Sequence, residues 1–154
     1  MHANADLIQR FYTAFQQRDA EQMIACYHPE VVFSDPVFPS LRGPKAGAMW
    51  RMLTRRAQDF SLTFRDVQAD AARGTAHWEA SYTFSDTGRR VLNVIDASFE
   101  FKDGKIIRHQ DRFDLWRWAS MALGPTGKWL GWLPPVQGAI RNKAARALER
   151  FLAE

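Results

Sequence analysis

The sequence predicts an α+β fold, in which three N-terminal helices cover one face of a curved antiparallel sheet and an extra helix follows at the C-terminus. Apolar residues recur at helical spacing over the first part of the chain. After Gln58 the pattern changes to a period of two, and turn pairs such as Asp103-Gly104 separate the later segments. Helices followed by hairpin-linked strands are typical of α+β domains.

The helical pattern predicts three helices before the sheet. The first carries an apolar stripe, which is Leu7, Ile8, Phe11 and Phe15. Asp19 is typical of the N-cap of a second helix, which we expect to end at His28-Pro29 because proline cannot continue a helix. A short strand is expected at Val31–Phe33, and Pro44 favours the first turn of a third helix.

Alternation predicts strands over residues 60–67, 75–84, 90–101 and from 105 onward, and a last helix over residues 137–152. In the last strand Ile107, His109, Asp111 and Phe113 share one face, because side chains two apart point the same way. If that face is the core face, a titratable pair is buried. Buried charges are costly unless paired, so such a placement usually marks a site.

The 154 residues suffice for one domain with a sizeable core. The net charge is +4, and residues 105–154 hold nine basic and four acidic residues. A basic tail can meet nucleic acid or a membrane, but a solvated helix face is the commoner meaning, so we expect no nucleic-acid partner. Membrane contact is also not expected, because the aromatic residues after Trp118 can instead cover one end of the sheet.

Cys26 is the single cysteine of the sequence, so no internal disulfide can form, and a reducing cytoplasm is the expected location. The first ten residues carry Asp6 and no apolar run, which does not predict a signal peptide. No spacing in the sequence matches a metal site, and no Gly-rich phosphate loop is present. We therefore expect neither a metal nor a cofactor.

Four ionisable residues in apolar surroundings are candidates for chemistry, namely Asp35, Asp96, His109 and Asp111. Asp96 lies within an apolar strand, where strand propensity disfavours aspartate. Each candidate also has a structural interpretation. These are an Asp-Pro turn for Asp35, an outward-facing position for Asp96, a hydrogen-bonded core histidine for His109 and an arginine pair for Asp111.

The first half of the chain contains QRFYTAF over residues 9–15, Arg18-Asp19 and VVFSDPV over residues 31–37. These strings resemble the nuclear transport factor 2-like superfamily, and within it the SnoaL-like and ketosteroid isomerase-like enzymes. The resemblance implies a cone-shaped, mixed sheet for residues 1–118, with residues 119–154 packed on the same domain. It also implies a homodimer and a small apolar ligand or substrate.

In ketosteroid isomerases the acid of such an Asp-Pro is the general base, and an Ile-Asp in a later strand supplies a protonated acid that donates to the dienolate oxygen. The resemblance implies these roles for Asp35 and Asp96. At the position of that family's helix tyrosine this chain has Phe11, and Tyr12 lies about 100° further around the helix. The implied pocket wall is Phe11, Tyr12, Phe15, Phe33, Trp50, Trp78, Tyr82 and Phe113.

The run DRFDL at residues 111–115 resembles the last strand of limonene epoxide hydrolase, which implies a catalytic acid at Asp111. Where that family has an Arg-x-Asp pair, this chain has Trp78 and Ala80, so epoxide hydrolysis ranks lower. We expect acid–base chemistry by an isomerase, dehydratase, cyclase or hydrolase, with His109 and Asp111 as a second acid–base couple. The alternative is a binding protein for a hydrophobic ligand, or a dimeric scaffold that uses the same pocket.

Overall fold

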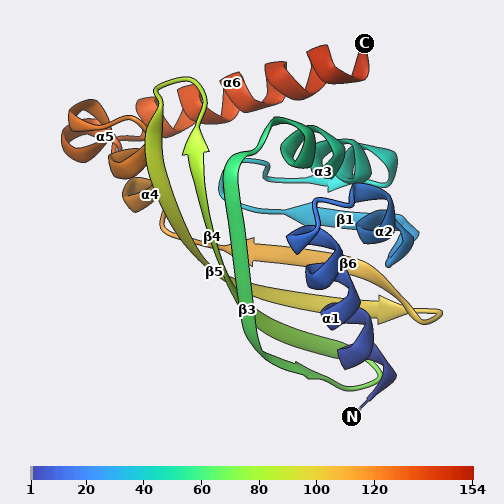
Figure 1. Cartoon of the computed structure of the whole chain (residues 1–154). Coiled ribbons are helices and arrows are strands. Elements are labelled where there is room, and N and C mark those ends of the chain that lie inside the picture. Colours follow the sequence, from blue (N-terminus) through green and yellow to red (C-terminus); the bar gives the residue numbers. More distant parts are fainter. Residues whose placement is uncertain (1) are drawn as a thin grey trace.

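The computed structural model describes residues 2–154 and confirms the α+β class (Figure 1). The elements in chain order are α1 (Ala3–Gln16), α2 (Ala20–Ala25), β1 (Tyr27–Ser34), β2 (Leu41–Arg42), α3 (Pro44–Arg56), β3 (Gln58–Ala69), β4 (Arg73–Phe84), β5 (Arg89–Lys102), β6 (Lys105–Arg112), α4 (Leu115–Ala122), α5 (Pro125–Leu130) and α6 (Pro134–Leu152). The strands form one open sheet in the order β2-β1-β6-β5-β4-β3. It is mixed, because β1 and β6 run parallel while the other neighbours are antiparallel.

The helices and the sheet pack around one large core. Figure 1 shows α1 lying across the sheet near β3, while α6 runs along one end of the sheet beside α3. The predicted stripe of α1 is buried, with Leu7, Ile8 and Phe11 at 1% exposure or less. This stripe faces the inward side chains of the strands, which confirms that the helices cover one face of the sheet.

The second helix begins where predicted but ends early. The carboxylate of Asp19 accepts a hydrogen bond from the backbone N–H of Gln22 at 3.1 Å, as an N-cap does. The helix stops at Ala25, and Tyr27 instead begins β1. Pairing with β6 is the reason, because the N–H of Ile106 donates to the carbonyl of Cys26 at 2.9 Å.

A bulge in β6 changes the expected face of that strand. Phe101 pairs with Ile106, but Glu100 pairs with Arg108, so Ile107 is an extra residue in the ladder. Ile106 therefore points inward and is fully buried, while Ile107 is half-buried. The prediction that Ile107 shares the face of His109 is wrong, although His109 and the residues after it keep the predicted alternation.

The tail contains two short helices that the periodicity did not predict. Asp114 caps α4 by accepting from the N–H of Arg117 at 3.1 Å, so α4 begins before residue 118. Gly127 and Gly131 let α5 rest directly on α4, because a Cβ on Gly127 would overlap the carbonyl of Ala119. Across residues 2–154, no helix combines the length and the hydrophobicity that crossing a bilayer requires.

Candidate active site

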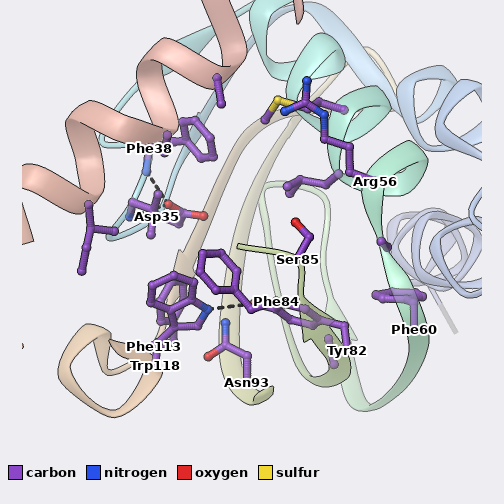
Figure 2. Close-up of a pocket in the computed structure, with 18 of the residues that line it drawn as sticks. Asp35, Phe38, Arg56, Phe60, Tyr82, Phe84, Ser85, Asn93, Phe113 and Trp118 are labelled. Atoms are coloured by element: carbon purple, nitrogen blue, oxygen red, sulfur yellow. Dashed lines mark hydrogen bonds between the residues drawn. The ribbon is translucent and has the colours of Figure 1, made fainter. Parts of the chain in front are cut away.

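The inner face of the sheet, α3 and α6 line a partly open cavity of about 400 Å³, within the size range of small-molecule sites. Figure 2 shows Asp35, Tyr82 and Asn93 around this space, with Phe113 and Trp118 beside them. Most of the wall is apolar. The expected wall residues that line it are Phe15, Trp50, Trp78, Tyr82 and Phe113. From α6 it receives Ile140, Ala144 and Ala147.

Asp35 lies directly after β1, on the cavity wall. Its Oδ1 atom accepts hydrogen bonds from the backbone N–H groups of Val37 (2.7 Å) and Phe38 (2.6 Å). The Asp-Pro turn is therefore real, but it does not exclude a site role, because both bonds use one oxygen. Burial raises the pKa of Asp35 from 3.8 to about 7, and the charge of Asp111 adds to the rise, against the lowering effect of the two N–H donors.

Asp111 is the second carboxylate on the cavity wall, and it is 3% exposed. Its Oδ1 atom lies 2.9 Å from Nε2 of His109 and accepts from the indole N–H of Trp78 at 3.3 Å. The arginine pair considered from the sequence does not form. No described residue bonds to the other oxygen, Oδ2, so each of the two carboxylates has one fixed oxygen and one without a partner.

His109 links Asp111 to a buried hydroxyl. Its Nδ1 atom lies 2.8 Å from the hydroxyl of Tyr27, which also accepts from the indole N–H of Trp50 at 2.8 Å. The tyrosine proton is then free to point at Nδ1, which makes Nε2–H the donor to Asp111. In this arrangement both ring nitrogens of His109 have a hydrogen-bond partner.

The strand register explains why the two carboxylates meet. β1 and β6 run parallel, with Phe33 opposite His109 and Ser34 opposite Gln110. The next step in this register brings Asp35 alongside Asp111. Residues 76 apart in sequence therefore share one wall, because of a parallel pairing that no local pattern reveals.

Asp96 does not lie in the cavity, which corrects the expected role of a protonated donor. Its side chain is 78% exposed on the opposite face of the sheet, where it lies 2.9 Å from Nδ1 of His77. The reason is strand alternation, since Asn93, Ile95 and Ala97 are the inward residues of β5.

Some residues expected at the wall lie behind it. Phe11 and Phe33 are fully buried and surround the ring of His109, with centroids 5.4 and 5.0 Å from it. His109 is itself fully buried and does not contact the cavity. Tyr12 is likewise buried, and its hydroxyl is the one buried side-chain polar atom within residues 2–154 that has no hydrogen-bond partner. Burial, with a smaller effect of Asp111, raises its pKa well above the ordinary value.

Sequence reasoning named Tyr82 as a wall residue but missed Asn93 and the hydrogen bond from Trp118 to Tyr82. Asn93 is 8% exposed and lines the cavity, and the alternation of Val91 and Ile95 around it could have placed it there. The indole N–H of Trp118 donates to the hydroxyl of Tyr82 at 2.8 Å (Figure 2). Burial raises the pKa of Tyr82, so its hydroxyl keeps a proton that it can donate into the cavity.

The described residues offer no evident metal site. Within residues 2–154, no three His, Cys, Asp or Glu side chains come together as metal ligands would.

Comparison with known proteins places this fold in a family. Residues 8–109 match the family model of the SnoaL-like domain. The chain belongs to the SnoaL-like family. The match ends within β6, so Asp111 and the helices α4 to α6 of this SnoaL-like protein lie beyond it. A search of curated proteins finds no match.

Solved structures share the fold of this SnoaL-like protein at low identity. An epoxide hydrolase from M. tuberculosis, of the limonene epoxide hydrolase-like type, is 21% identical over 75% of this chain and 86% of its own, with a TM-score of 0.64. A proposed polyketide cyclase from Xanthomonas campestris is 22% identical over 77% and 96%, with a TM-score of 0.64. A hypothetical protein with a ketosteroid isomerase-like fold, from Catenulispora acidiphila, is 9% identical over 80% and 95%, with a TM-score of 0.68. This confirms the nuclear transport factor 2-like fold.

Proposed function

We propose that this protein is an enzyme that moves a proton at a carbon next to a carbonyl group of a small apolar substrate, with Asp35 as general base. The supporting observation is the pair of carboxylates, Asp35 and Asp111, on one mostly apolar cavity. Each has one oxygen held by N–H donors and one oxygen without a protein partner. Fixed carboxylates in a desolvated space suit acid–base catalysis.

The environment of Asp35 matches the task of a general base. A pKa of about 7 leaves much of this carboxyl ionised at neutral pH, while making it a stronger base than a solvated aspartate. Its bonds to Val37 and Phe38 fix Oδ1, so Oδ2 is the oxygen that receives the proton. Asp111 supports this role, because its charge contributes to the raised pKa of Asp35.

The donors for the developing oxyanion are Tyr82 and Asn93. Tyr82 accepts from Trp118 and keeps its own O–H for donation, and Asn93 offers an amide N–H₂ from the neighbouring strand β5. Because both are neutral donors aimed at an apolar space, they stabilise negative charge on a substrate oxygen without prior proton transfer. They take over the role that the sequence resemblance implied for Asp96.

The proposed step balances within the site. Oδ2 of Asp35 takes the proton, the electrons of the broken C–H bond form a C=C bond, and the carbonyl oxygen becomes an enolate oxygen. Return of the proton to another carbon gives isomerisation. Attack of the enolate carbon on a second carbonyl gives ring closure, and the proton on Asp35 then passes to the new alkoxide. The proposed polyketide cyclases among the structural neighbours support the second outcome.

A carbon-acid probe tests the base without knowledge of the natural substrate. Deprotonation of a nitrobenzisoxazole transfers one C–H proton to the base, forms a nitrile and breaks the N–O bond to release a coloured phenolate. We expect a saturable rate that rises with pH through about 7, and a loss of about 100-fold or more in Asp35→Asn. Asp96→Asn is the matched control, because this carboxylate is exposed on the other face, and its rate should equal that of the unchanged protein.

The outcomes separate the enzyme from the alternative of a binding protein. Saturable binding of the probe without acceleration would favour a non-catalytic ligand carrier. An undiminished rate in Asp35→Asn would remove this residue as the base. Equal losses in Asp35→Asn and Asp96→Asn would also contradict the proposal, because the second side chain does not contact the cavity.

A further inference from the structure

Three exposed tryptophans gather around α5, at the end of the molecule where Figure 1 shows α4 and α5. Trp129 is 70% exposed, Trp132 is 55% exposed and Trp116 is 46% exposed, and Leu130 beside them is 45% exposed. The expectation that the aromatic residues of the tail cover one end of the sheet is therefore wrong for this group. We call Trp116, Lys128, Trp129, Leu130 and Trp132 the tryptophan platform.

Hydrogen bonds from indole side chains to backbone carbonyls within the platform hold it in place. The indole N–H of Trp116 donates to the carbonyl of Lys128 at 3.0 Å, and that of Trp132 donates to the carbonyl of Trp129 at 3.1 Å. Below it, Gly127 brings α5 into direct contact with the backbone of α4. The rings of Trp116 and Trp132 are thus part of a packed unit, and their indole N–H groups are already bonded to backbone carbonyls.

The sequence around the platform carries more basic than acidic residues, although Asp114 caps α4 beside Trp116 and Lys143 of α6 pairs with Asp86. Residues 115–148 hold five basic residues and no acidic residue. Within the platform, Nζ of Lys128 lies 5.6 Å from the ring centroid of Trp129. Arg89 adds a further guanidinium, because it donates to the carbonyl of Met121 at 2.8 Å and lies against Gly124, just before α5.

We propose that the tryptophan platform docks on the surface of an anionic lipid membrane. Indole rings favour the membrane–water interface, and basic side chains favour a leaflet with anionic headgroups. With the indole N–H groups of Trp116 and Trp132 bonded internally, the platform offers ring faces and a positive charge rather than directional bonds. Such contact suits a fluid lipid surface. The proposal does not depend on the chemistry of the cavity.

Vesicle co-sedimentation tests the docking. The purified chain is mixed with vesicles of phosphatidylcholine, with or without phosphatidylglycerol. We expect the unchanged chain to bind the anionic vesicles, and this binding should weaken at high salt. The double variant Trp129→Ala/Trp132→Ala should bind them about tenfold more weakly, or more weakly still. Leu92→Ala is the matched control, because Leu92 is 43% exposed on the outer face of the sheet. Circular dichroism checks that both variants remain folded.

A second measurement locates the contact. Brominated acyl chains quench tryptophans that enter the lipid, so fluorescence quenching should be present in the unchanged chain and absent in the double variant. Failure of the unchanged chain to sediment with anionic vesicles overturns the proposal. This holds even if the platform is then found to bind an acidic protein, because the proposal is for a membrane. Equal binding of the unchanged chain and the double variant overturns it as well. Neither readout changes if Asp35 proves not to be a base.

Discussion

Replacing Asp35 by asparagine should stabilise the protein at alkaline pH while it abolishes proton transfer. The asparagine keeps a carbonyl oxygen for the N–H groups of Val37 and Phe38, but it carries no charge. Burial is the largest cause that raises the pKa of Asp35 from 3.8 to about 7. A catalytic base in an apolar cavity thus destabilises the fold that holds it, and the asparagine removes that effect.

The direction of the pH dependence follows from proton binding. The folded protein holds the proton of Asp35 more tightly than the unfolded chain, so stability falls as pH rises between about 4 and about 7. At lower pH both states are protonated, and the group contributes nothing. Above this window the ionised carboxylate lowers the free energy of unfolding by on the order of 4 kcal/mol.

Urea unfolding followed by tryptophan fluorescence measures this difference. At about pH 8 the Asp35→Asn variant should gain up to about 4 kcal/mol over the unchanged protein, and at about pH 4 the two should be nearly equal. Asp66→Asn serves as control, because the side chain of Asp66 is 74% exposed. A gain of the same size at both pH values, or a net loss at about pH 8, would refute the reasoning.

Further changes test the buried network, the outer face of the sheet and the tail. Tyr27→Phe should cost about 2–4 kcal/mol, because it leaves two buried polar groups without partners, whereas Tyr12→Phe should add about 1 kcal/mol by removing an unpaired hydroxyl. Urea unfolding of this matched pair should show opposite signs. Hydrogen bonds to carboxylates, that of Asp96 foremost, raise the pKa of His77, so His77→Gln should lose more stability below about pH 6 than above about pH 9 in unfolding titrations. Gly127→Ala should cost about 2 kcal/mol or more in thermal unfolding, because its Cβ would overlap the facing helix backbone.

The sequence was sufficient for the order of the elements other than β2, α4 and α5, and for three of the polar residues near the site. Alternation placed His109 and Asp111 on the inner face of β6, and the resemblance pointed to Asp35. These inferences held because they depend only on local sequence, namely the alternation of side chains along one strand and the short motif that contains Asp35. The bulge at Ile107 did not disturb them, since the alternation resumes after it.

The inferences that failed depend on which face of a strand a residue occupies and on pairing between strands that are distant in sequence. Both faces of β5 carry apolar residues, with Leu92 outside and Ile95 inside, so the pattern could not decide which face receives Asp96. The role of Tyr27 arises from the pairing of β1 with β6, which converts the expected end of a helix into a strand. Asn93 was not among the candidates because these were ionisable residues in apolar surroundings, and an amide side chain is not ionisable.

Because α6 forms part of the cavity wall, we expect its attachment to govern how quickly a molecule enters and leaves the cavity. This helix forms part of the wall and buries Leu148. Several of its other contacts are ion pairs near the surface, such as that of Lys143 with Asp86 at 2.8 Å and that of Glu149 with Lys45 at 3.7 Å. Exposed ion pairs contribute little and weaken with salt. The residence time of a bound molecule should therefore shorten as ionic strength rises, while the proton affinity of Asp35 beneath the helix stays nearly the same.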